Sequence, residues 1–515
     1  MTEAPAAVPA TSQARKKALL GFSVVVLALA FAGWNVIGCP VKLRYPGELN
    51  FIEGMPLAEM VHLRQGVPIY APASAQWYDA ANFGPLYYLV GARLVDPVEP
   101  SYLPLRLLST LGTLGCAVGC GLLAYWLAQS YLAAVLAPLL FLSFGFVIRH
   151  GASARSDIVA LFLVFAGFLV AFKFRCGRTL LLATPLLLAG FYYKQQFVAA
   201  PLAILVFLLL ERRYRPAAEF AGLMVLGGLC LLGLFQFVVF TGQVFLHHFV
   251  FYNVLPFMRV ELVEGLLFFG MLLLIPLLVG LEFLRLNPDR LLMSYLICAV
   301  LLSLLTVSRA GSDTYYFLEC IIILCPLFAA LVAKRIEEPD RAVELVILLI
   351  VTLFVGQWFR TPTPTPKEFG QDRAAQDYFR RHFLPGTRVL SYYTGDMVRS
   401  GLQTPITNLY HYNQLVRKGA LNDREMVTQL ETHYFGVVVV DFDLQTERES
   451  YWLDFYLTER IRRAIQANYH LAATVEMPGP EKLREEARFY VWVPNTPARA
   501  AVPPGPEAAQ PVRGR

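Results

Sequence analysis

The sequence predicts a polytopic α-helical membrane protein with about eleven transmembrane helices and a small α/β C-terminal domain outside the membrane. Three observations lead to this fold class. Hydrophobic residues make up 56% of the 515 residues, charged residues make up 16%, and the mean hydropathy is +0.51, so the chain is more apolar than a soluble domain. Eleven apolar runs follow one another between residues 18 and 359. After Arg360 the composition turns polar.

The N-terminal residues 1–17 form a polar tail that ends in Arg15, Lys16 and Lys17. The next run, 18–37, is too long for the apolar region of a secretory signal, so we expect a retained first span. The remaining runs have roughly the 17 to 25 residues that a bilayer requires. They are 103–128, 131–148, 157–172, 179–193, 196–210, 217–241, 263–284, 291–307, 314–333 and 342–359. The runs 179–193 and 196–210 are short enough to form a re-entrant pair instead.

The positions of Lys and Arg predict which side each loop faces. If the N-terminal tail is cytoplasmic, alternation of the spans places fourteen cations inside and five outside, as the positive-inside rule requires. The inner set is Arg15, Lys16, Lys17, Lys173, Arg175, Arg178, Arg212, Arg213, Arg215, Arg285, Arg290, Lys334, Arg335 and Arg341, and the outer set is Arg149, Arg155, Lys194, Arg259 and Arg309. We therefore predict a multi-pass protein of the inner (plasma) membrane with its C-terminal domain outside the cytoplasm.

The first outer loop, residues 38–102, is the longest loop between spans. Its segment "YPGELNFIEGMPLAEM" carries Glu48, Glu53 and Glu59. The Pro, Tyr and Trp residues of the loop favour helices that lie at the membrane surface, because aromatic rings prefer the headgroup region. The sequence thus places three carboxylates just outside the first span.

The other outer loops are polar where the inner loops offer little beyond Lys and Arg. They read "RHGASARSD", "YYKQQ", "HHFVFYNVLPFMRVELVEG" and "SRAGSDTYYFLE". Ionisable groups at the ends of spans are costly and often mark a site. We expect an outer cavity whose cations bind a phosphate and whose carboxylates take up a proton or hold a metal. The structural alternative for each residue is an ion pair between helices, such as Arg155 with Asp157 or Arg309 with Asp313.

Five stretches, in this order and on one predicted side, resemble the GT-C superfamily of integral-membrane glycosyltransferases, particularly the glycosyltransferase family 39, aminoarabinose-transferase and protein-mannosyltransferase-like set. They are "FIEGMPLAEMVHLRQGVPIY", "FGPLYYLVGA", "ARSDIVALFLVFAGFLV", "KQQFVAAPLAILVFLL" and "GSDTYYFLE". The resemblance covers about residues 18–360. Two positions depart from the family pattern: Ile52 precedes Glu53 where the family has Asp before Glu, and Gly84 replaces one Pro before Pro85.

The resemblance implies inverting transfer of a sugar from a polyprenyl-phosphate donor to an acceptor outside the cytoplasm. Glu53, or else Glu48, would be the base, with Asp157 as a second acidic residue. Arg155, Lys194 and Arg309 would bind the lipid phosphate. The remaining expected substrate contacts are Gln195, Gln196, Asp313, Tyr315, Tyr316 and Glu319. The residues indicate no particular metal ligands, although a divalent metal is possible.

Residues 360–370 read as a Pro-rich linker, and residues 371–495 alternate helix and strand patterns, which predicts the outer α/β domain. We expect helices at 371–383 and 451–469 and strands at 387–393, 435–443, 471–477 and 487–494. Asp441 and Asp443 follow a buried strand, where they could bind a ligand or simply end the strand. The resemblance implies that this domain recognises the acceptor. Residues 496–515 are Pro- and Ala-rich and are predicted to be disordered.

Two other classes of function stay open on the sequence alone. A transporter or flippase of lipid-linked or small molecules also requires polar groups within spans, although the sequence has no convincing internal repeat. A non-catalytic membrane scaffold that presents the C-terminal domain gives no reason for cations to gather beside carboxylates. Nucleic-acid binding is disfavoured, because the cations form short clusters between apolar runs instead of one basic stripe. The expected partners are a polyprenyl-phosphate-linked sugar, membrane lipids and an unknown acceptor.

Overall fold

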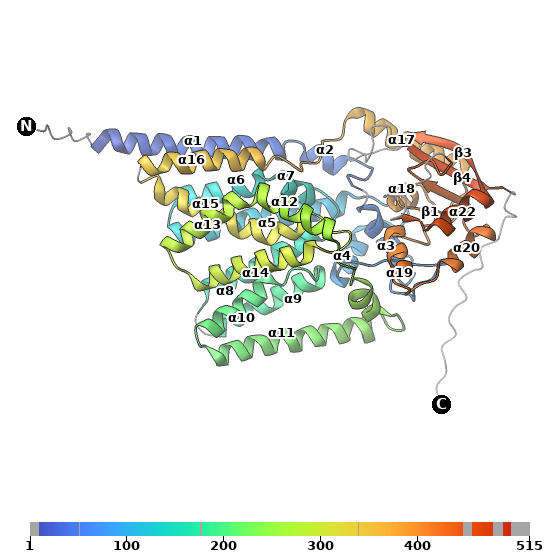
Figure 1. Cartoon of the computed structure of the whole chain (residues 1–515), viewed down its shortest axis with the longest axis horizontal. Helices are drawn as coiled ribbons and strands as arrows, with labels where there is room; N and C mark the ends of the chain where they lie inside the picture. Colours follow the sequence, from blue (N-terminus) through green and yellow to red (C-terminus); the bar gives the residue numbers. More distant parts are fainter. Residues whose placement is uncertain are drawn as a thin grey trace, which may run out of the picture.

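A bundle of long helices and a small α/β domain lie end to end along the longest axis of the molecule (Figure 1). The structure is a computed structural model that describes residues 10–50, 52–175, 178–337, 339–445, 456–476 and 488–495. The N-terminus lies at the end of the bundle farthest from the α/β domain (Figure 1). The predicted disordered tail, 496–515, falls outside the described residues.

The described part of every predicted apolar run is largely helical, because local hydropathy and helix propensity agree there. The bundle consists of α1 (Ala10–Val36), α5 (Leu103–Ala128), α6 (Tyr131–Ser143), α7 (Gly145–Gly151), α8 (Asp157–Lys173), η1 (Arg178–Ala183), α9 (Thr184–Tyr193), α10 (Ala199–Leu210), α11 (Tyr214–Leu234), η2 (Phe235–Val239), α12 (Arg259–Leu272), α13 (Leu274–Leu286), α14 (Arg290–Val307), η4 (Thr314–Phe317), α15 (Leu318–Arg335) and α16 (Pro339–Val355).

Five of these helices are long and apolar enough to cross a membrane, and up to seven spans result if each bent pair counts as one. The bent pairs are α6 with α7, at 75°, and α12 with α13, at 61°. The helices at 179–193, 199–210 and 342–355 are apolar but shorter. The chain is therefore a multi-pass helical membrane protein, and a total of eleven spans stays a prediction.

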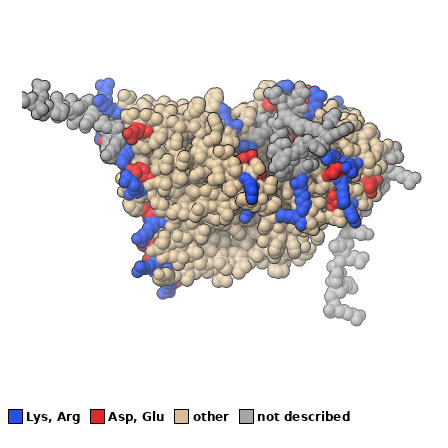
Figure 2. All heavy atoms as spheres, in the orientation of Figure 1, with Lys and Arg blue, Asp and Glu red and all other residues tan. Residues whose placement is uncertain are grey.

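The charges are distributed as a membrane protein requires. Figure 2 shows Lys, Arg, Asp and Glu gathered at the free end of the bundle and over the α/β domain, with a broad uncharged belt between them. Within this belt the span that begins with α11 has only 6% of its apolar window buried and exposes Leu226 and Leu229. Such side chains are stable on a surface only where lipid replaces water.

The middle of the bundle is closely packed around α15, whose apolar window is 89% buried. A helix that is apolar on all sides belongs inside a bundle. Glycines allow neighbouring backbones to approach: a Cβ on Gly121 would lie 2.7 Å from the carbonyl oxygen of Ala134, and one on Gly190 would lie 2.4 Å from a methyl carbon of Val164. Small residues at helix contacts are typical of membrane bundles, since they increase van der Waals contact.

The first outer loop contains three short helices, α2 (Cys39–Arg44), α3 (Gly54–Arg64) and α4 (Pro85–Leu94), and their location at the membrane surface stays a prediction. A further short helix, η3 (His247–Tyr252), lies in the loop after α11. Between α3 and α4 the chain pairs with the C-terminal domain, because Tyr78 N–H donates to Pro405 O at 2.7 Å and Thr407 N–H donates to Tyr78 O at 3.0 Å. The outer loop therefore joins the bundle to the α/β domain.

The α/β domain is built on a four-stranded sheet in the order β1-β2-β4-β3. Its elements are α17 (Pro366–His382), β1 (Val389–Ser391), α18 (Thr394–Arg399), α19 (Leu409–Arg417), α20 (Asp423–Glu431), β2 (Val437–Val440), α22 (Glu459–Asn468), β3 (Tyr469–Glu476) and β4 (Arg488–Pro494). β1 pairs with β2 in parallel, and the other two pairs are antiparallel. All four residues of β2 are buried, as expected for a central strand.

Several boundaries differ from the predicted ones. α17 begins at Pro366 instead of residue 371, because Thr365 and Glu368 form a capping box, so part of the predicted linker is helical. α22 begins only at Glu459, after the cap Thr458, and residues 451–455 of the predicted helix lie outside the described residues. The helices α18, α19 and α20 were not predicted, because with six, nine and nine residues they are shorter than the window over which a helical period is read.

Candidate functional site

Two of the predicted phosphate ligands meet one predicted acidic residue at the start of α8. Arg155 Nε lies 2.8 Å from Asp157 Oδ2, and Lys194 Nζ contacts Asp157 Oδ1. The three side chains come from the loop before α8, its first residue and the loop after α9, and their exposed fractions are 2%, 0% and 7%. The buried carboxylate is satisfied by both cations, so the ion pair that the structural alternative expects between Arg155 and Asp157 is formed.

The loop before α15 completes this cluster. Asp313 Oδ2 lies 3.6 Å from Arg155 Nη1, while Asp313 Oδ1 accepts a hydrogen bond from Thr314 N–H at 2.6 Å. The Tyr315 ring lies 3.9 Å from Lys194 Nζ and 4.8 Å from the guanidinium carbon of Arg155, so it makes cation–π contacts with both. We call Arg155, Asp157, Lys194, Asp313 and Tyr315 the charged cluster.

The charged cluster is largely buried, since the side chains of Arg155, Asp157 and Lys194 are at most 7% exposed. Two surface cavities, of about 530 and 420 Å³, are lined by other residues. Asp313 is the most exposed of the charged side chains, at 23%, which leaves one carboxylate in reach of solvent. Burial would raise the pKa of the Asp313 carboxyl, but neighbouring cationic side chains, Arg149 and Arg155 among them, lower it below its ordinary value. Burial lowers the pKa of Lys194 to about 8, although Asp157 opposes that shift.

The other predicted ligands lie around this cluster at different depths. Tyr316 stacks on Tyr315 with ring centroids 4.5 Å apart, and Arg309, which precedes Asp313 in the same loop, is exposed. Among the described residues, no ion pair joins Arg309 to Asp313, because Arg155 takes that carboxylate. Arg309 therefore lies at the edge of the cluster.

Of the remaining three predicted contacts, Gln195 and Glu319 bond to neighbouring segments of the bundle. Gln195 Nε2 donates to Phe249 O at 3.2 Å, and Gln196 is partly exposed next to it. Glu319 is buried in the first turn of α15, where it accepts from Tyr295 OH at 3.3 Å and from Ala199 N–H at 3.4 Å. Glu319 thus joins α15 to α14 and α10.

Glu53 does not have the open position that a catalytic base requires. Its Oε1 accepts from Arg106 Nε at 3.0 Å and from Ala154 N–H at 2.5 Å, and its Oε2 accepts from Arg106 Nη2 at 2.6 Å and from Leu49 N–H at 2.7 Å. Both side chains of the Glu53–Arg106 pair are 0% exposed. The expectation of a base at Glu53 is corrected here: the residue fixes the loop before α8 to the first outer loop. An arginine near the start of an apolar run was the sequence signal for this partner.

The carboxylate of Glu48 is also buried away from solvent. Both carboxylate oxygens are buried without a hydrogen-bond partner, and a Cβ on Gly54 would lie 2.1 Å from Glu48 Oε1. Burial is the main reason that the pKa of Glu48 is raised, and the charge of Asp396 adds to the effect. Glu48 lies between the bundle and α18 of the outer domain, so the expectation that it substitutes for Glu53 as an open base is also corrected.

Glu59, for which the sequence indicates no role, joins the first outer loop to the outer domain by hydrogen bonds. Its Oε1 accepts from Ala81 N–H and from Thr407 Oγ1, each at 2.8 Å. These bonds hold Ala81 at φ +45°, a left-handed conformation that is rare outside glycine. Burial, together with the charge of Asp79, raises the pKa of Glu59 to about 7. The turn that Glu59 holds leads directly to Phe83, whose ring lies 5.0 Å from Lys194 Nζ.

Metal ligation has no support from the geometry of the described chain. Among its residues, no three His, Cys, Asp or Glu side chains come together in an arrangement that could hold an ion. His248 illustrates why: its ring nitrogens face the carbonyl oxygens of Ala71 and Ala80 at 2.8 and 3.3 Å, so the ring packs a loop.

The fold and the site define a polytopic helical membrane protein that carries a buried charged cluster where its helices meet a small α/β domain. Known structures include proteins that share this architecture. The chain is similar to two crystal structures of ArnT from Cupriavidus metallidurans, which bears out the predicted resemblance at the level of the fold. One is bound to undecaprenyl phosphate and the other is in the apo state.

The similarity extends over 90% of this chain and 97% of each ArnT chain, with TM-scores of 0.54 and 0.53 and 11% sequence identity in both cases. No protein-family model and no curated protein matches the sequence. At this identity the comparison shows the fold, and the roles of individual residues have to be argued from their geometry.

Proposed function

We propose that this protein is a membrane glycosyltransferase that moves a sugar from a polyprenyl-phosphate donor to an acceptor outside the cytoplasm, with inversion. The observation that carries the proposal is the charged cluster, in which Arg155 and Lys194 lie side by side at one end of a bundle with the fold of ArnT. The ArnT structure bound to undecaprenyl phosphate supports a lipid phosphate as the ligand class. The location in the inner membrane and the orientation predicted from the loops belong to the same proposal.

The donor phosphate competes with two carboxylates, those of Asp157 and Asp313, for the two cations of the cluster. In the described structure Asp157 and Asp313 neutralise the two cations, which lowers the cost of keeping those cations out of water. The donor phosphodiester carries one negative charge, as a carboxylate does, but its two free oxygens can contact Arg155 and Lys194 together, and the polyprenyl phosphate monoester that is released carries a higher charge. We therefore propose that binding shifts Asp313, the more exposed acid, away from Arg155 while Asp157 keeps its place at the start of α8.

Asp313 is then the base that fits the geometry best. Its carboxyl is ionised at neutral pH even at the ordinary pKa of an aspartate, and its side chain is partly exposed beside the two phosphate-binding cations. The acceptor hydroxyl attacks the anomeric carbon, its proton passes to Asp313, and the bond between that carbon and the phosphate oxygen breaks. Arg155 and Lys194 stabilise the negative charge that grows on the departing polyprenyl phosphate.

The test is release of polyprenyl phosphate from polyprenyl-phosphate sugars by the purified protein, followed by mass spectrometry with a panel of sugars. We expect Asp313→Asn to reduce transfer by about 10²- to 10⁴-fold, the usual contribution of a general base, while donor binding stays within a few-fold of wild type. Glu264→Gln, on the exposed surface of α12, is the matched control. Full transfer by Asp313→Asn would remove Asp313 from the mechanism, and absence of release with every sugar would reject the enzyme.

A transporter or flippase stays the second candidate. The buried, mutually neutralised charges of the cluster are also compatible with a lipid-phosphate site that moves its ligand without chemistry. The same assay separates the two, because a transporter binds the lipid phosphate but leaves the sugar–phosphate bond intact. A non-catalytic scaffold would do neither.

A further inference from the structure

The outer domain presents a row of tyrosines at one edge of its sheet. The strands β1 and β2 are parallel, so their carboxyl ends lie at the same edge. Tyr392 and Tyr393 follow β1, and Asp441 follows β2. Ligands of open α/β sheets bind outside the carboxyl ends of parallel strands, because the loops diverge there and leave room. This edge is therefore where a ligand of the outer domain is expected.

The aromatic rings form a continuous row. The ring centroids of Tyr392 and Tyr456 lie 4.1 Å apart, and those of Tyr456 and Tyr410 lie 6.0 Å apart. All three tyrosines and Asp441 are partly exposed, and Tyr393 OH donates to Asp441 Oδ2 at 3.0 Å. That bond orients the carboxylate next to the rings. We call Tyr392, Tyr410, Tyr456 and Asp441 the tyrosine edge.

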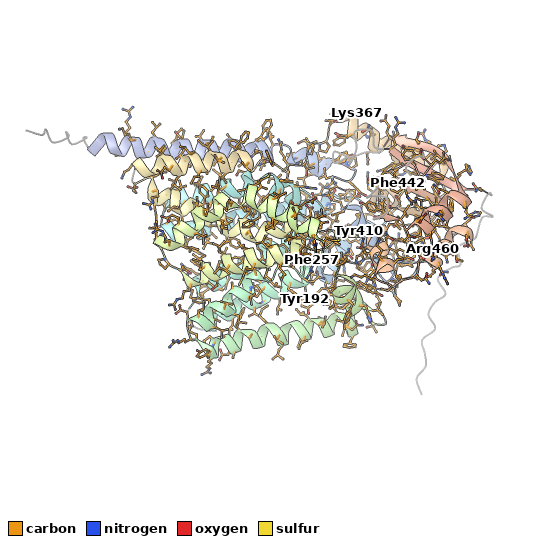
Figure 3. All side chains as sticks on the ribbon, viewed as in Figure 1. Tyr192, Phe257, Lys367, Tyr410, Phe442 and Arg460 are labelled. Atoms are coloured by element: carbon orange, nitrogen blue, oxygen red, sulfur yellow. The ribbon has the colours of Figure 1, made fainter. Side chains whose placement is uncertain are left out.

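The tyrosine edge reaches the loop that carries the charged cluster. Tyr410, labelled in Figure 3 near the boundary between the outer domain and the bundle, packs on Gly311. A Cβ on Gly311 would lie 3.2 Å from Tyr410 Cε1, and Gly311 has φ +73°, so glycine suits both the contact and the backbone. Only Ser312 separates Gly311 from Asp313. One end of the row thus lies beside the proposed base.

The chemistry of the tyrosine edge matches a neutral sugar. Tyrosine rings offer flat apolar faces on which the C–H face of a pyranose packs, and a carboxylate accepts hydrogen bonds from the hydroxyls of the sugar. None of the four residues is a cation, so a phosphate or carboxylate ligand would find no opposite charge among them. A hydroxyl-rich ligand without net charge is the class that these groups fit.

We infer that the tyrosine edge binds a neutral glycan acceptor and presents one of its hydroxyls to the charged cluster. This inference rests on the proposed glycosyltransferase function and adds the acceptor class and the residues that select it. Tyr456 and Tyr392 stack on the sugar rings, Asp441 accepts from their hydroxyls, and Tyr410 borders the passage to Asp313.

The test uses the full chain in detergent micelles, fluorescently labelled and applied to an array of neutral and acidic bacterial oligosaccharides. We expect the wild-type protein to retain neutral oligosaccharides, with at least tenfold weaker retention for Tyr456→Ala and for Asp441→Asn. Asp443→Asn is the control, because Asp443 lies two residues further on and accepts from Gln445 N–H within its own turn. Circular dichroism of every variant checks that the domain stays folded.

The outcomes separate this inference from the proposed function. Retention of no neutral oligosaccharide by wild type, retention of acidic ones alone, or equal retention by Asp441→Asn and wild type would overturn it. Polyprenyl-phosphate binding is measured on the same samples. Tyr456→Ala and Asp441→Asn should leave it unchanged, since both residues lie in the outer domain and neither belongs to the charged cluster. A wild-type protein that binds glycans but no polyprenyl phosphate would count against the proposed function while leaving the glycan site standing.

Discussion

Replacement of Glu53 by Gln tests whether this residue is structural or catalytic. The substitution keeps the size of the side chain but turns one carboxylate oxygen into an NH₂ group. Each oxygen of Glu53 accepts one hydrogen bond from Arg106 and one from a backbone N–H, of Ala154 or Leu49. An amide oxygen can keep two of these donors, and the other two then face the NH₂ group.

The expected cost follows from the burial of the pair. Removing one partner of a buried ion pair typically costs about 3–5 kcal/mol, because the remaining charge is left uncompensated. Arg106 keeps its bonds to the carbonyl oxygens of Lys42 and Gly47, at 3.1 and 2.7 Å, so we expect a value of about 3 kcal/mol, near the lower limit of this range. Thermal unfolding of the purified protein, followed by Trp fluorescence, should show a midpoint several degrees below wild type.

The comparison with activity decides the assignment. Glu264→Gln, which changes an exposed carboxylate, should unfold like wild type. If Glu53→Gln unfolds at the wild-type temperature but transfers no sugar, Glu53 is a catalytic group and the structural argument is wrong. If its midpoint falls and the fraction that remains folded still transfers sugar, the Glu53–Arg106 pair is structural.

Two further predictions concern the charged cluster and the outer loop. Lys194→Ala should weaken binding of polyprenyl phosphate by about tenfold or more, since a hydrogen bond to a charged group contributes about 1.5–3 kcal/mol. The control is Arg215→Ala, which changes an exposed cation at the end of α11 farthest from the cluster. Equal affinities of Lys194→Ala and wild type for polyprenyl phosphate in a binding titration would contradict the role of Lys194. The pKa of Glu59 is raised to about 7 in the folded protein, above its ordinary value of 4.5, so its contribution to stability is fully present below pH 4.5 and is lost as the pH rises through 7. Unfolding midpoints measured from pH 4.5 to pH 8 should therefore fall less for Glu59→Gln than for wild type, and parallel curves would rule out the shift.

Hydropathy predicted the helices of the bundle, because the preference of an apolar run for lipid or for a packed interior is a local property. The loops with Arg155, Lys194 and Asp313 were expected on one side for a similar reason: alternation of spans fixes the side of each loop. The structure brings these three residues together, with Asp157 between the two cations. Arg309 lies at the edge of the cluster, because Asp313 pairs with Arg155.

The roles of the glutamates in the first outer loop could not be read in the same way. Glu53 and its partner Arg106 are 53 positions apart, and Glu59 lies 348 positions from Thr407. Nothing in the local sequence distinguishes a buried glutamate that is fully hydrogen-bonded from one that faces a substrate. The capping box of Thr365 and Glu368, by contrast, is a local signal that the sequence carried and that places the start of α17.

The sequence by itself determined that the chain is apolar enough to cross a membrane many times and that its polar loops fall on one predicted side. Both follow from the cost of moving side chains and backbone between water and lipid, which each segment bears on its own. The tertiary structure alone decided which carboxylates are exposed and which are buried. It also decided that the tyrosine edge of the outer domain contacts the loop of Asp313. The physical reason is that burial and pairing depend on atoms contributed by distant segments, and these meet only when the chain is folded.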